Sequence, residues 1–231
     1  MRRTLKKPDT GRKIKLLAMK ITIVYDNRAV RPELSADHGF ACLVEMKSAP
    51  AILFDTGARG PILKHNMAAL GVDPGSIGTV VISHRHSDHT GGLSDVIEMT
   101  EDVEVFLPES FMTGIAARRV TRVRGPLEIS PGVHSTGELS GIEQSLVLAT
   151  GKGPVVLVGC AHSGLDDILR AASGYGEVWG VIGGFHGFQD FHLLDSLSLI
   201  CPCHCTVYRE EIGRLCGDRY RNCGVGTVIE L

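Results

Sequence analysis

The sequence predicts a mixed α/β domain arranged as a layered sandwich of sheets and helices. β-rich segments recur along the chain from residue 21 to residue 230, and segments with helical apolar spacing interrupt them. Residues 47–50 have the composition of a hairpin turn. At least one pair of neighbouring strands is therefore expected to be antiparallel, which argues against a simple parallel doubly wound sheet. The 231 residues are enough to bury a substantial core.

Strands and helices alternate in the first half of the chain. Stretches rich in β-branched and apolar residues predict strands over residues 21–25, 40–45, 51–54, 79–82 and 103–107. Apolar residues at helical spacing predict helices over residues 61–70, 93–99 and 110–117. Gly71 is suited to end the first of these helices as a C-cap. The segment 79–82 is continuously apolar, which predicts a fully buried strand.

Strands are more frequent in the second half of the chain. The same signals predict strands over residues 120–128, 133–136, 145–150, 154–158, 178–182 and 226–230. Helices are predicted over residues 166–172, 191–199 and 209–215. No segment has the composition of a long linker, so we predict a single domain over residues 19–231.

The net charge of −2 conceals an asymmetry between the N-terminus and the rest of the chain. Of 24 Lys+Arg and 26 Asp+Glu, residues 1–18 carry seven basic residues and one acid, which leaves 17 basic and 25 acidic residues elsewhere. We expect residues 1–18 to be a basic, disordered extension. A start codon assigned upstream of Met19 would also give this pattern. A basic arm can bind nucleic acid, but the acidic remainder argues against a broad nucleic-acid surface.

Composition and cysteine usage indicate an ordinary globular protein. No apolar run approaches the roughly 20 residues of a membrane span, so no membrane partner is expected. The N-terminus lacks the apolar stretch of a secretory leader, so we expect the seven cysteines to be free thiols in the cytoplasm. The run Cys201-Pro-Cys203-His204-Cys205 is similar to a metal knuckle but lacks the Cys-x-x-Cys spacing of structural zinc sites. We therefore expect His204 to matter more than its cysteine neighbours.

The strongest chemical signal is a histidine-rich motif that directly follows the buried strand 79–82. It reads Ser83-His84-Arg-His86-Ser-Asp88-His89-Thr-Gly91-Gly92. Histidine suits zinc and other first-row divalent metals, and aspartate adds a harder oxygen ligand. In extended chain His84, His86 and Asp88 would point the same way and His89 elsewhere. One short loop could therefore serve two adjacent metal ions.

This motif is the signature of the metallo-β-lactamase fold superfamily, which the chain resembles over residues 19–231. Asp55, in Ile52-Leu-Phe-Asp-Thr-Gly57, is similar to the upstream aspartate of that superfamily. The resemblance implies a four-layer αββα sandwich, of the α+β kind within the α/β class. It also implies that the metals lie at one edge, where the loops after the strands meet.

A narrower resemblance is carried by short motifs that occur in the expected order. They are His38-Gly-Phe40, Val158-Gly-Cys160-Ala-His162-Ser-Gly164, Gly183-Gly-Phe-His186 and Cys203-His204-Cys-Thr206. Together they are similar to a branch that contains metal-dependent hydrolases resembling dihydropterin ribofuranosyl-aminobenzene 5′-phosphate synthase.

The resemblance implies a metal-ligating role for six residues of this chain. His84 and His86 match the first metal site, and Asp88 and His89 match the second. The remaining two are His204, which matches the C-terminal metal histidine, and His162, which follows the predicted strand 154–158. The implied cofactors are two divalent metal ions, zinc in the first place, with iron and manganese as alternatives.

Three residues carry further roles in this interpretation. Asp88 would also orient the nucleophile, and Asp55 would orient a ligand histidine through a hydrogen bond. His186 would contact the substrate beside the metals, with a core histidine at a strand end as its alternative. His38 is a weaker candidate of the same kind.

Two positions leave the ligand set open. Cys160 stands where the superfamily usually has a bridging aspartate. It could be a thiolate ligand, a residue behind the ligands or a small buried residue. His134 is the alternative to His162 as the remaining histidine ligand.

A cluster of arginines is the other charged feature. Arg118, Arg122 and Arg124 would share one face of a strand and could clamp a phosphate or carboxylate. The interpretation we favour is a solvated edge strand, in which charges discourage aggregation.

These observations favour a metal-dependent hydrolase that acts on a small-molecule ester, lactone or phosphoester through a metal-bound hydroxide. The alternative enzyme is a transferase of the dihydropterin ribofuranosyl-aminobenzene 5′-phosphate synthase type. It would join a dihydropterin diphosphate to a ribosyl-aminobenzene phosphate, so its substrates carry phosphate. The alternative of another class is a nucleic-acid-binding protein that uses the basic arm of residues 1–18. The oligomeric state is not predicted.

Overall fold

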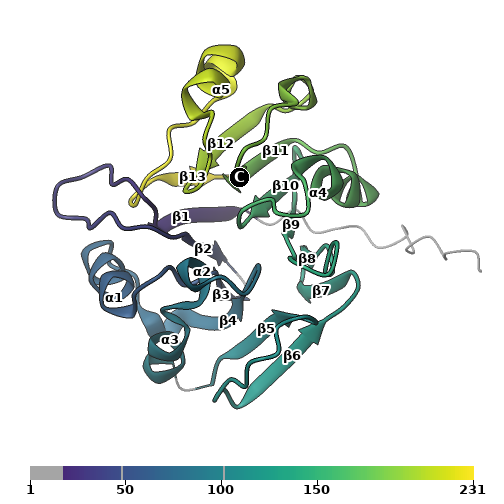
Figure 1. Ribbon diagram of the computed structural model, residues 1–231. Helices are drawn as coiled ribbons and strands as arrows, with labels where there is room; N and C mark the ends of the chain where they lie inside the picture. Colours follow the sequence, from purple (N-terminus) through teal and green to yellow (C-terminus); the bar gives the residue numbers. More distant parts are fainter. Residues whose placement is uncertain (1–17, 48, 101) are drawn as a thin grey trace, which may run out of the picture.

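The computed structural model describes residues 18–47, 49–100 and 102–231. Within these residues the strands form two sheets, and helices cover the outer face of each sheet (Figure 1). The first sheet, in spatial order, consists of β13 (Val228–Glu230), β1 (Met19–Tyr25), β2 (Ala41–Met46), β3 (Ala49–Phe54), β4 (Ile77–Val81), β5 (Glu104–Pro108) and β6 (Arg119–Val123). The second consists of β12 (Leu199–Cys203), β11 (Gly180–Gly184), β10 (Gly153–Val158), β9 (Leu146–Thr150), β8 (Val133–Ser135) and β7 (Leu127–Ser130).

The main core lies between the two sheets. Ile21, Val44 and Phe54 of the first sheet belong to one buried cluster with Leu148 and Leu157 of the second. Each of these side chains is at most 1% exposed. Alternation of side chains along each strand sends the other set of apolar residues to the outer faces, where helices cover them.

Two helices cover each outer face. On the first sheet, α1 (Gly60–Ala69) and α3 (Leu93–Met99) pack Leu63 and Val96 against the strands. On the second, α4 (Leu165–Ala172) and α5 (Arg209–Cys216) pack Ile168 and Ile212 in the same way. The order of layers is therefore helix, sheet, sheet, helix, which confirms the predicted αββα sandwich.

Six strand ends converge on one edge of the sandwich. In the first sheet β3 is parallel to β4, and β1 runs in the same direction because β2 is antiparallel to both β1 and β3. In the second sheet β10, β11 and β12 are parallel to one another. The loops after parallel strands meet at the same sheet edge, which is where ligands bind in open sheets of this kind. The short helix α2 (Ser87–Thr90), which the sequence analysis did not predict, follows β4 at this edge.

Three predicted elements are wrong. Residues 110–117 were expected to be helical but are irregular; Gly114 disfavours a helix there, and Met112 is 88% exposed. The single strand expected over residues 120–128 is two strands, β6 and β7, in different sheets. Pro126 lies between them, and proline has no N–H group to continue the ladder.

The third error is the helix expected over residues 191–199. Only Phe191–Leu194 forms a short 3₁₀ helix, and Leu199 begins strand β12. All five residues of β12 are buried beside parallel β11, so its apolar run has no alternation that would separate it from a helix. Pro202 is tolerated in it because β12 is the edge strand of its sheet.

The expectation of free thiols is wrong for one pair. Cys203, at the end of β12, forms a disulfide with Cys223. The other cysteines of the described chain, Cys42, Cys160, Cys201, Cys205 and Cys216, are free.

The N-terminal extension falls almost entirely outside the described residues, because residues 1–17 of the predicted arm 1–18 are not among them. Within residues 18–47, 49–100 and 102–231, none of the helices is both long and apolar enough to cross a membrane.

Substitution of a leucine between the sheets tests the assignment of the core. Leu148→Ala removes a side chain that is 0% exposed, and we expect the free energy of unfolding to fall by about 2–5 kcal/mol in a denaturant titration. Leu215→Ala is the matched control, because Leu215 on α5 is 61% exposed and its loss should change stability by less than about 0.5 kcal/mol. Equal losses in the two variants would contradict this assignment.

Candidate metal centre

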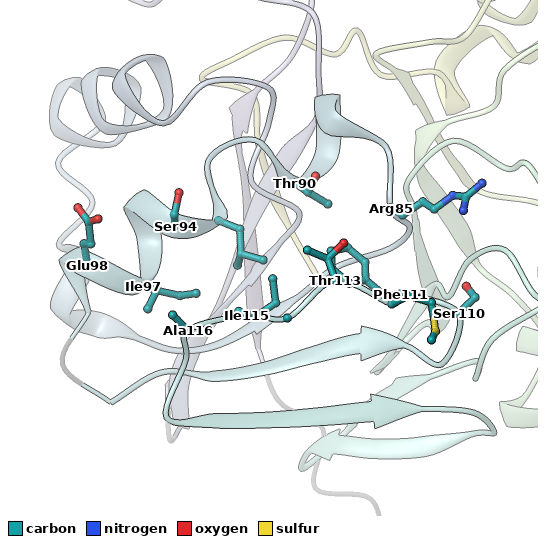
Figure 2. Close-up of a pocket in the computed structure, with 13 residues that line it drawn as sticks. Arg85, Thr90, Ser94, Ile97, Glu98, Ser110, Phe111, Thr113, Ile115 and Ala116 are labelled. Atoms are coloured by element: carbon teal, nitrogen blue, oxygen red, sulfur yellow. The ribbon is translucent and has the colours of Figure 1, made fainter.

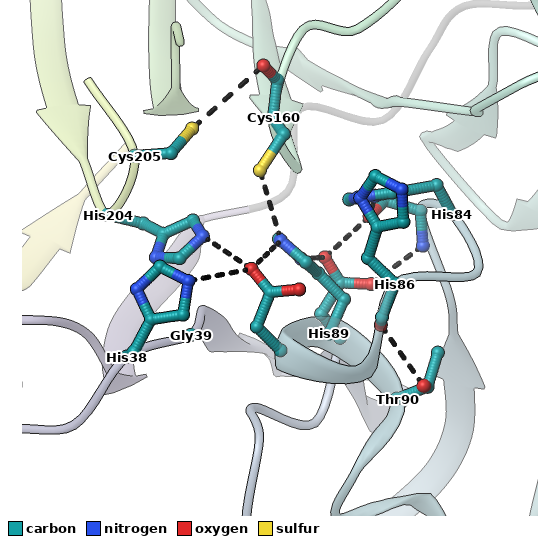
Figure 3. Close-up of polar contacts among 12 residues, drawn as sticks. His38, Gly39, His84, His86, His89, Thr90, Cys160, His204 and Cys205 are labelled. Carbon is teal, nitrogen blue, oxygen red and sulfur yellow. Dashed lines mark hydrogen bonds and ion pairs between the residues drawn. The ribbon is translucent and has the colours of Figure 1, made fainter. Parts of the chain in front are cut away.

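The loop after β4 brings the histidine-rich motif to the edge where the strand ends meet (Figure 3). His84 and His89 are buried, Asp88 is half-buried, and His86 is exposed. The loop turns into α2 at Ser87, so the alternation expected for extended chain ends there. Asp88 consequently points to His89 and His204 and not, as predicted, with His84 and His86.

A buried carboxylate fixes the start of this loop. Asp55, directly after β3, is 0% exposed and accepts hydrogen bonds from the Ser83 backbone N–H and the Ser83 hydroxyl, each at 2.7 Å. Its Oδ2 atom also accepts a hydrogen bond from His89 Nδ1 at 2.7 Å. The carboxylate therefore ties the ends of two neighbouring parallel strands together and orients the His89 ring.

Three imidazoles are held with the same nitrogen toward the protein. His89 Nδ1 donates to Asp55, His84 Nδ1 donates to Ser83 Oγ at 2.9 Å, and His204 Nδ1 donates to Asn27 Oδ1 at 2.8 Å. A neutral imidazole that carries its proton on Nδ1 presents a lone pair at Nε2. All three Nε2 atoms are thus prepared to bind a cation, in the way that outer hydrogen bonds orient metal-ligating histidines.

Asp88 is the meeting point of one group of ligating atoms. Its Oδ2 atom lies 3.0 Å from His204 Nε2, 3.5 Å from His89 Nε2 and 3.4 Å from His38 Nε2. Figure 3 shows His38 and His204 pointing at the same carboxylate. One ligating atom each from Asp88, His89, Cys160 and His204 forms a group within 4.8 Å.

A second group lies beside the first. Ligating atoms of His84, Cys160 and His162 are all within 4.8 Å of one another. His86 joins this group, because its Nδ1 atom is 3.0 Å from His84 Nε2 and its ring is centred 4.8 Å from the His162 ring. Cys160 is the residue that the two groups have in common.

The electrostatics of the site favour positive charge. Burial lowers the pKa of His89, but the carboxylates of Asp55 and Asp88 outweigh burial and raise it to about 9. Burial raises the pKa of Asp88, but its contacts with His204 and His89 hold that pKa well below its usual range. Burial and the neighbouring histidines lower the pKa of His84 to about 2, so this imidazole is neutral. Metal binding requires a neutral histidine beside an ionised carboxylate, so a cation that binds His89 displaces a proton from it.

These residues fit divalent cations. The Nε2 lone pairs of His89 and His204 face an ionised carboxylate oxygen, an arrangement that is repulsive unless a proton or a cation lies between them. The Nε2 atom of His162 is buried and has no hydrogen-bond partner among the described residues, which leaves it free to bind a cation. Nitrogen, carboxylate and sulfur ligands in this combination suit zinc and other first-row metals.

Backbone strain is concentrated at the same edge. Asp55, Ala161, His186 and His204 have φ values of 59°, 55°, 48° and 45°. Non-glycine residues seldom adopt this left-handed conformation, and where they do the position is often functional. The strained residues follow β3, β10, β11 and β12, so the strain lies where these strands deliver their side chains to the site.

Two predicted histidines stand apart from these groups. His134 lies in β8 with its ring 4.8 Å from Tyr175, and neither group of ligating atoms includes it. His186 is exposed, with its ring 5.1 Å from the His162 ring, so it lies at the rim of the cluster. The two glycines before His186 approach backbone: a Cβ on Gly183 would lie 1.9 Å from the Val158 carbonyl oxygen.

The residues that hold His204 were not predicted from the sequence. Asn27 accepts from its Nδ1 atom, and the buried Asp26 accepts from its backbone N–H at 2.7 Å. Arg209 contacts Asp26 in turn at 3.9 Å. A usable signal was present, since Asp26 and Asn27 are polar and directly follow a strongly apolar strand.

Of the arginine cluster, Arg122 lies in β6, the edge strand of its sheet, and Arg118 and Arg124 flank that strand. Arg118 and Arg119 pair with Asp102 at 3.7 and 3.5 Å. Arg122 lies over the Phe111 ring and donates to the Thr113 carbonyl at 3.2 Å. These partners engage Arg118 and Arg122 in contacts within the protein.

A cavity of about 640 Å³ lies beside the histidine loop, on the side of α3 (Figure 2). It lies between α3 and residues 110–116, and Arg85 and Thr90 connect it to the loop. Its walls are largely apolar and include Ile97, Phe111 and Ile115. Because the lining contains none of the histidines and not Cys160, we describe it as a neighbour of the metal centre.

The chain was compared with known families and structures. Residues 35–172 match the family described as Metallo-beta-lactamase superfamily. A 7,8-dihydropterin-6-methyl-4-(beta-D-ribofuranosyl)-aminobenzene-5′-phosphate synthase of Methanocaldococcus jannaschii is 25% identical over 82% of this chain and 88% of its own length. An uncharacterized protein of the same organism is 25% identical over 82% and 91%, respectively.

Solved structures with the same fold are also similar to this chain. Tm1679, described as a metal-dependent hydrolase of the beta-lactamase superfamily, has a TM-score of 0.74 at 25% identity and covers 92% of this chain and 99% of its own. The metallo-beta-lactamase fold protein YhfI of Bacillus subtilis has a TM-score of 0.56 at 13% identity, with coverage of 92% and 99%. The second likeness concerns the fold alone.

The role of Asp55 can be tested by one substitution. Asp55→Asn keeps the size and the tolerance for a positive φ, but its amide nitrogen cannot accept from Ser83 or His89. We expect metal affinity to fall about 10- to 100-fold, which is the usual loss when a residue that hydrogen-bonds to a metal ligand is replaced. Competition with a chromogenic chelator measures this affinity. In the control Asp73→Asn, a side chain that caps a distant 3₁₀ helix is replaced by one that caps equally well. Unchanged affinity in Asp55→Asn would refute the orienting role.

Proposed function

The chain belongs to the metallo-beta-lactamase superfamily, and on that basis we propose that it is a metal-dependent hydrolase of a small-molecule ester, lactone or phosphoester. The observation that carries the proposal is the set of Nε2 lone pairs that converge with Asp88 at one edge of the sandwich. Tm1679, a relative of similar length, is described as a metal-dependent hydrolase, which supports the same activity class.

We propose two divalent ions, zinc or, alternatively, iron or manganese, held by the two groups of ligating atoms. His84, His86 and His162 would hold one ion, and Asp88, His89 and His204 the other. When bound, such ions polarise the electrophilic oxygen of a substrate and lower the pKa of a water molecule from 15.7 to about 7.

The chain itself supplies orientation and charge. Asp55 and Ser83 keep the protons of His89 and His84 on Nδ1, which leaves each Nε2 atom free to bind. Asp88 is half-buried, so its ionised carboxylate borders solvent and can orient a nucleophilic water. The exposed imidazoles of His38 and His186, on either side of the centre, would contact the substrate.

A transferase is the second candidate, favoured by the named synthase relative. Its product carries a phosphate, so a basic group near the centre would be required to hold it. Arg85, between His84 and His86 in the sequence, is exposed and is the nearest arginine along the chain. Incubation of purified protein with a dihydropterin diphosphate and a ribosyl-aminobenzene phosphate distinguishes the candidates. A condensation product favours the transferase, and turnover of simple phosphodiesters, lactones or esters favours the hydrolase.

Alanine at either of two motif histidines tests the metal assignment. We expect His84→Ala and His86→Ala each to abolish turnover and to lower the metal content, because a nitrogen ligand is lost. Elemental analysis measures the metal, and circular dichroism should show that the fold is retained. His65→Ala is the control: His65 is exposed on α1, and its loss should leave metal and activity unchanged. Full metal occupancy in both motif variants would show that the assignment is wrong.

A further inference from the structure

We propose that the thiolate of Cys160 is a ligand shared by both metal ions of the centre. The inference rests on the proposed metal-dependent function and adds one ligand to it. It assigns to this chain a sulfur ligand between two sets of histidines.

The backbone forces Cys160 against the histidine loop. Cys160 follows β10, is 3% exposed, and has its Sγ atom 3.1 Å from His89 Nε2. A Cβ on the preceding Gly159 would lie 2.2 Å from Ser83 Oγ, so only glycine lets the end of β10 approach the loop this closely. On the other side, a Cβ on Gly184 would lie 3.3 Å from the Cys160 Cα atom. The cysteine is therefore wedged between the ends of β4 and β11.

The sulfur atom is common to both groups of ligating atoms. It lies within 4.8 Å of ligating atoms of Asp88, His89 and His204 in one group, and of His84 and His162 in the other. A single ligand in both groups, with one ion in each, contacts both ions. His89 Nε2 and this sulfur are hydrogen-bonded at 3.1 Å, which places both ligating atoms within reach of one cation (Figure 3).

The other buried free cysteines show what a structural role looks like in this fold. Cys42 and Cys201 belong to the apolar core between the sheets, and Cys216 belongs to the cluster under α4 and α5. Within the described residues, Cys160 is part of none of the three apolar clusters, although it is equally buried. Its surroundings are imidazoles and a carboxylate, so apolar packing does not account for its position.

The proton of the Cys160 thiol leaves when the sulfur binds a cation. A coordinating thiol is deprotonated outright by the bound ion, and the proton passes to solvent. Sulfur ligation also selects among metals, since thiolate suits zinc and disfavours magnesium and calcium.

X-ray absorption at the zinc edge tests the sulfur ligand in protein loaded with two equivalents of zinc. We expect a sulfur shell at about 2.3 Å in the wild type and no such shell in Cys160→Ser. Cys205→Ser and Cys216→Ser are the controls; the first removes the neighbouring thiol and the second a buried thiol elsewhere. Both controls should keep the shell. A shell that persists in Cys160→Ser, or that disappears in Cys205→Ser, overturns the proposal.

A cobalt(II) titration of the metal-free protein tests the sharing. A shared thiolate gives a sulfur-to-cobalt charge-transfer band that grows through both equivalents, whereas a sulfur bound to one ion gives a band that saturates at the first. Saturation at one equivalent overturns the proposal. If two zinc ions bind and turnover persists without a sulfur shell, this inference fails and the hydrolase remains; if no metal binds, both fail.

Discussion

The hydrogen bonds accepted by the buried carboxylate of Asp55 are the interaction on which the rest of the site depends. Asp55 joins the end of β3 to the loop after β4 through Ser83 and holds His89 by its Nδ1 atom. A buried carboxylate is costly unless it is hydrogen-bonded, and the three short hydrogen bonds that Asp55 accepts also fix its own geometry. Through Ser83 the same carboxylate reaches His84, and thereby sets which nitrogen of two histidines faces the other ligating groups.

The second constraint is that the two sheets deliver complementary halves of the centre. The first sheet supplies the histidine motif, and the second supplies Cys160, His162 and His204 from the ends of β10 and β12. Neither sheet alone supplies all the ligating atoms that lie around Asp88 and Cys160. Four left-handed residues concentrate strain at this edge, and the inter-sheet core must offset it. The rigidity of that core keeps ligands from different sheets in register.

Much of the fold could be predicted because apolar periodicity is a local property. Strands β1 to β5, β8 to β10 and β13, and helices α1, α3, α4 and α5, all follow from it. It failed for β12, where a buried parallel strand has no alternation, and over residues 110–117, where apolar side chains face a cavity. The motif from His84 to His89 was visible because its members are adjacent. The position of Asn27 after an apolar strand could mark it as a candidate, but its partner His204 lies 177 positions away and is set by the packing of two sheets.

The central claim is that one edge of this sandwich holds two metal ions with ligands from both sheets. A crystal structure of the zinc-loaded protein, with anomalous differences recorded at the zinc edge, tests it most directly. We expect two peaks, one bonded to His84, His86 and His162 and the other to Asp88, His89 and His204, with Cys160 Sγ between them. A single peak, or zinc bound elsewhere in place of this edge, would contradict it.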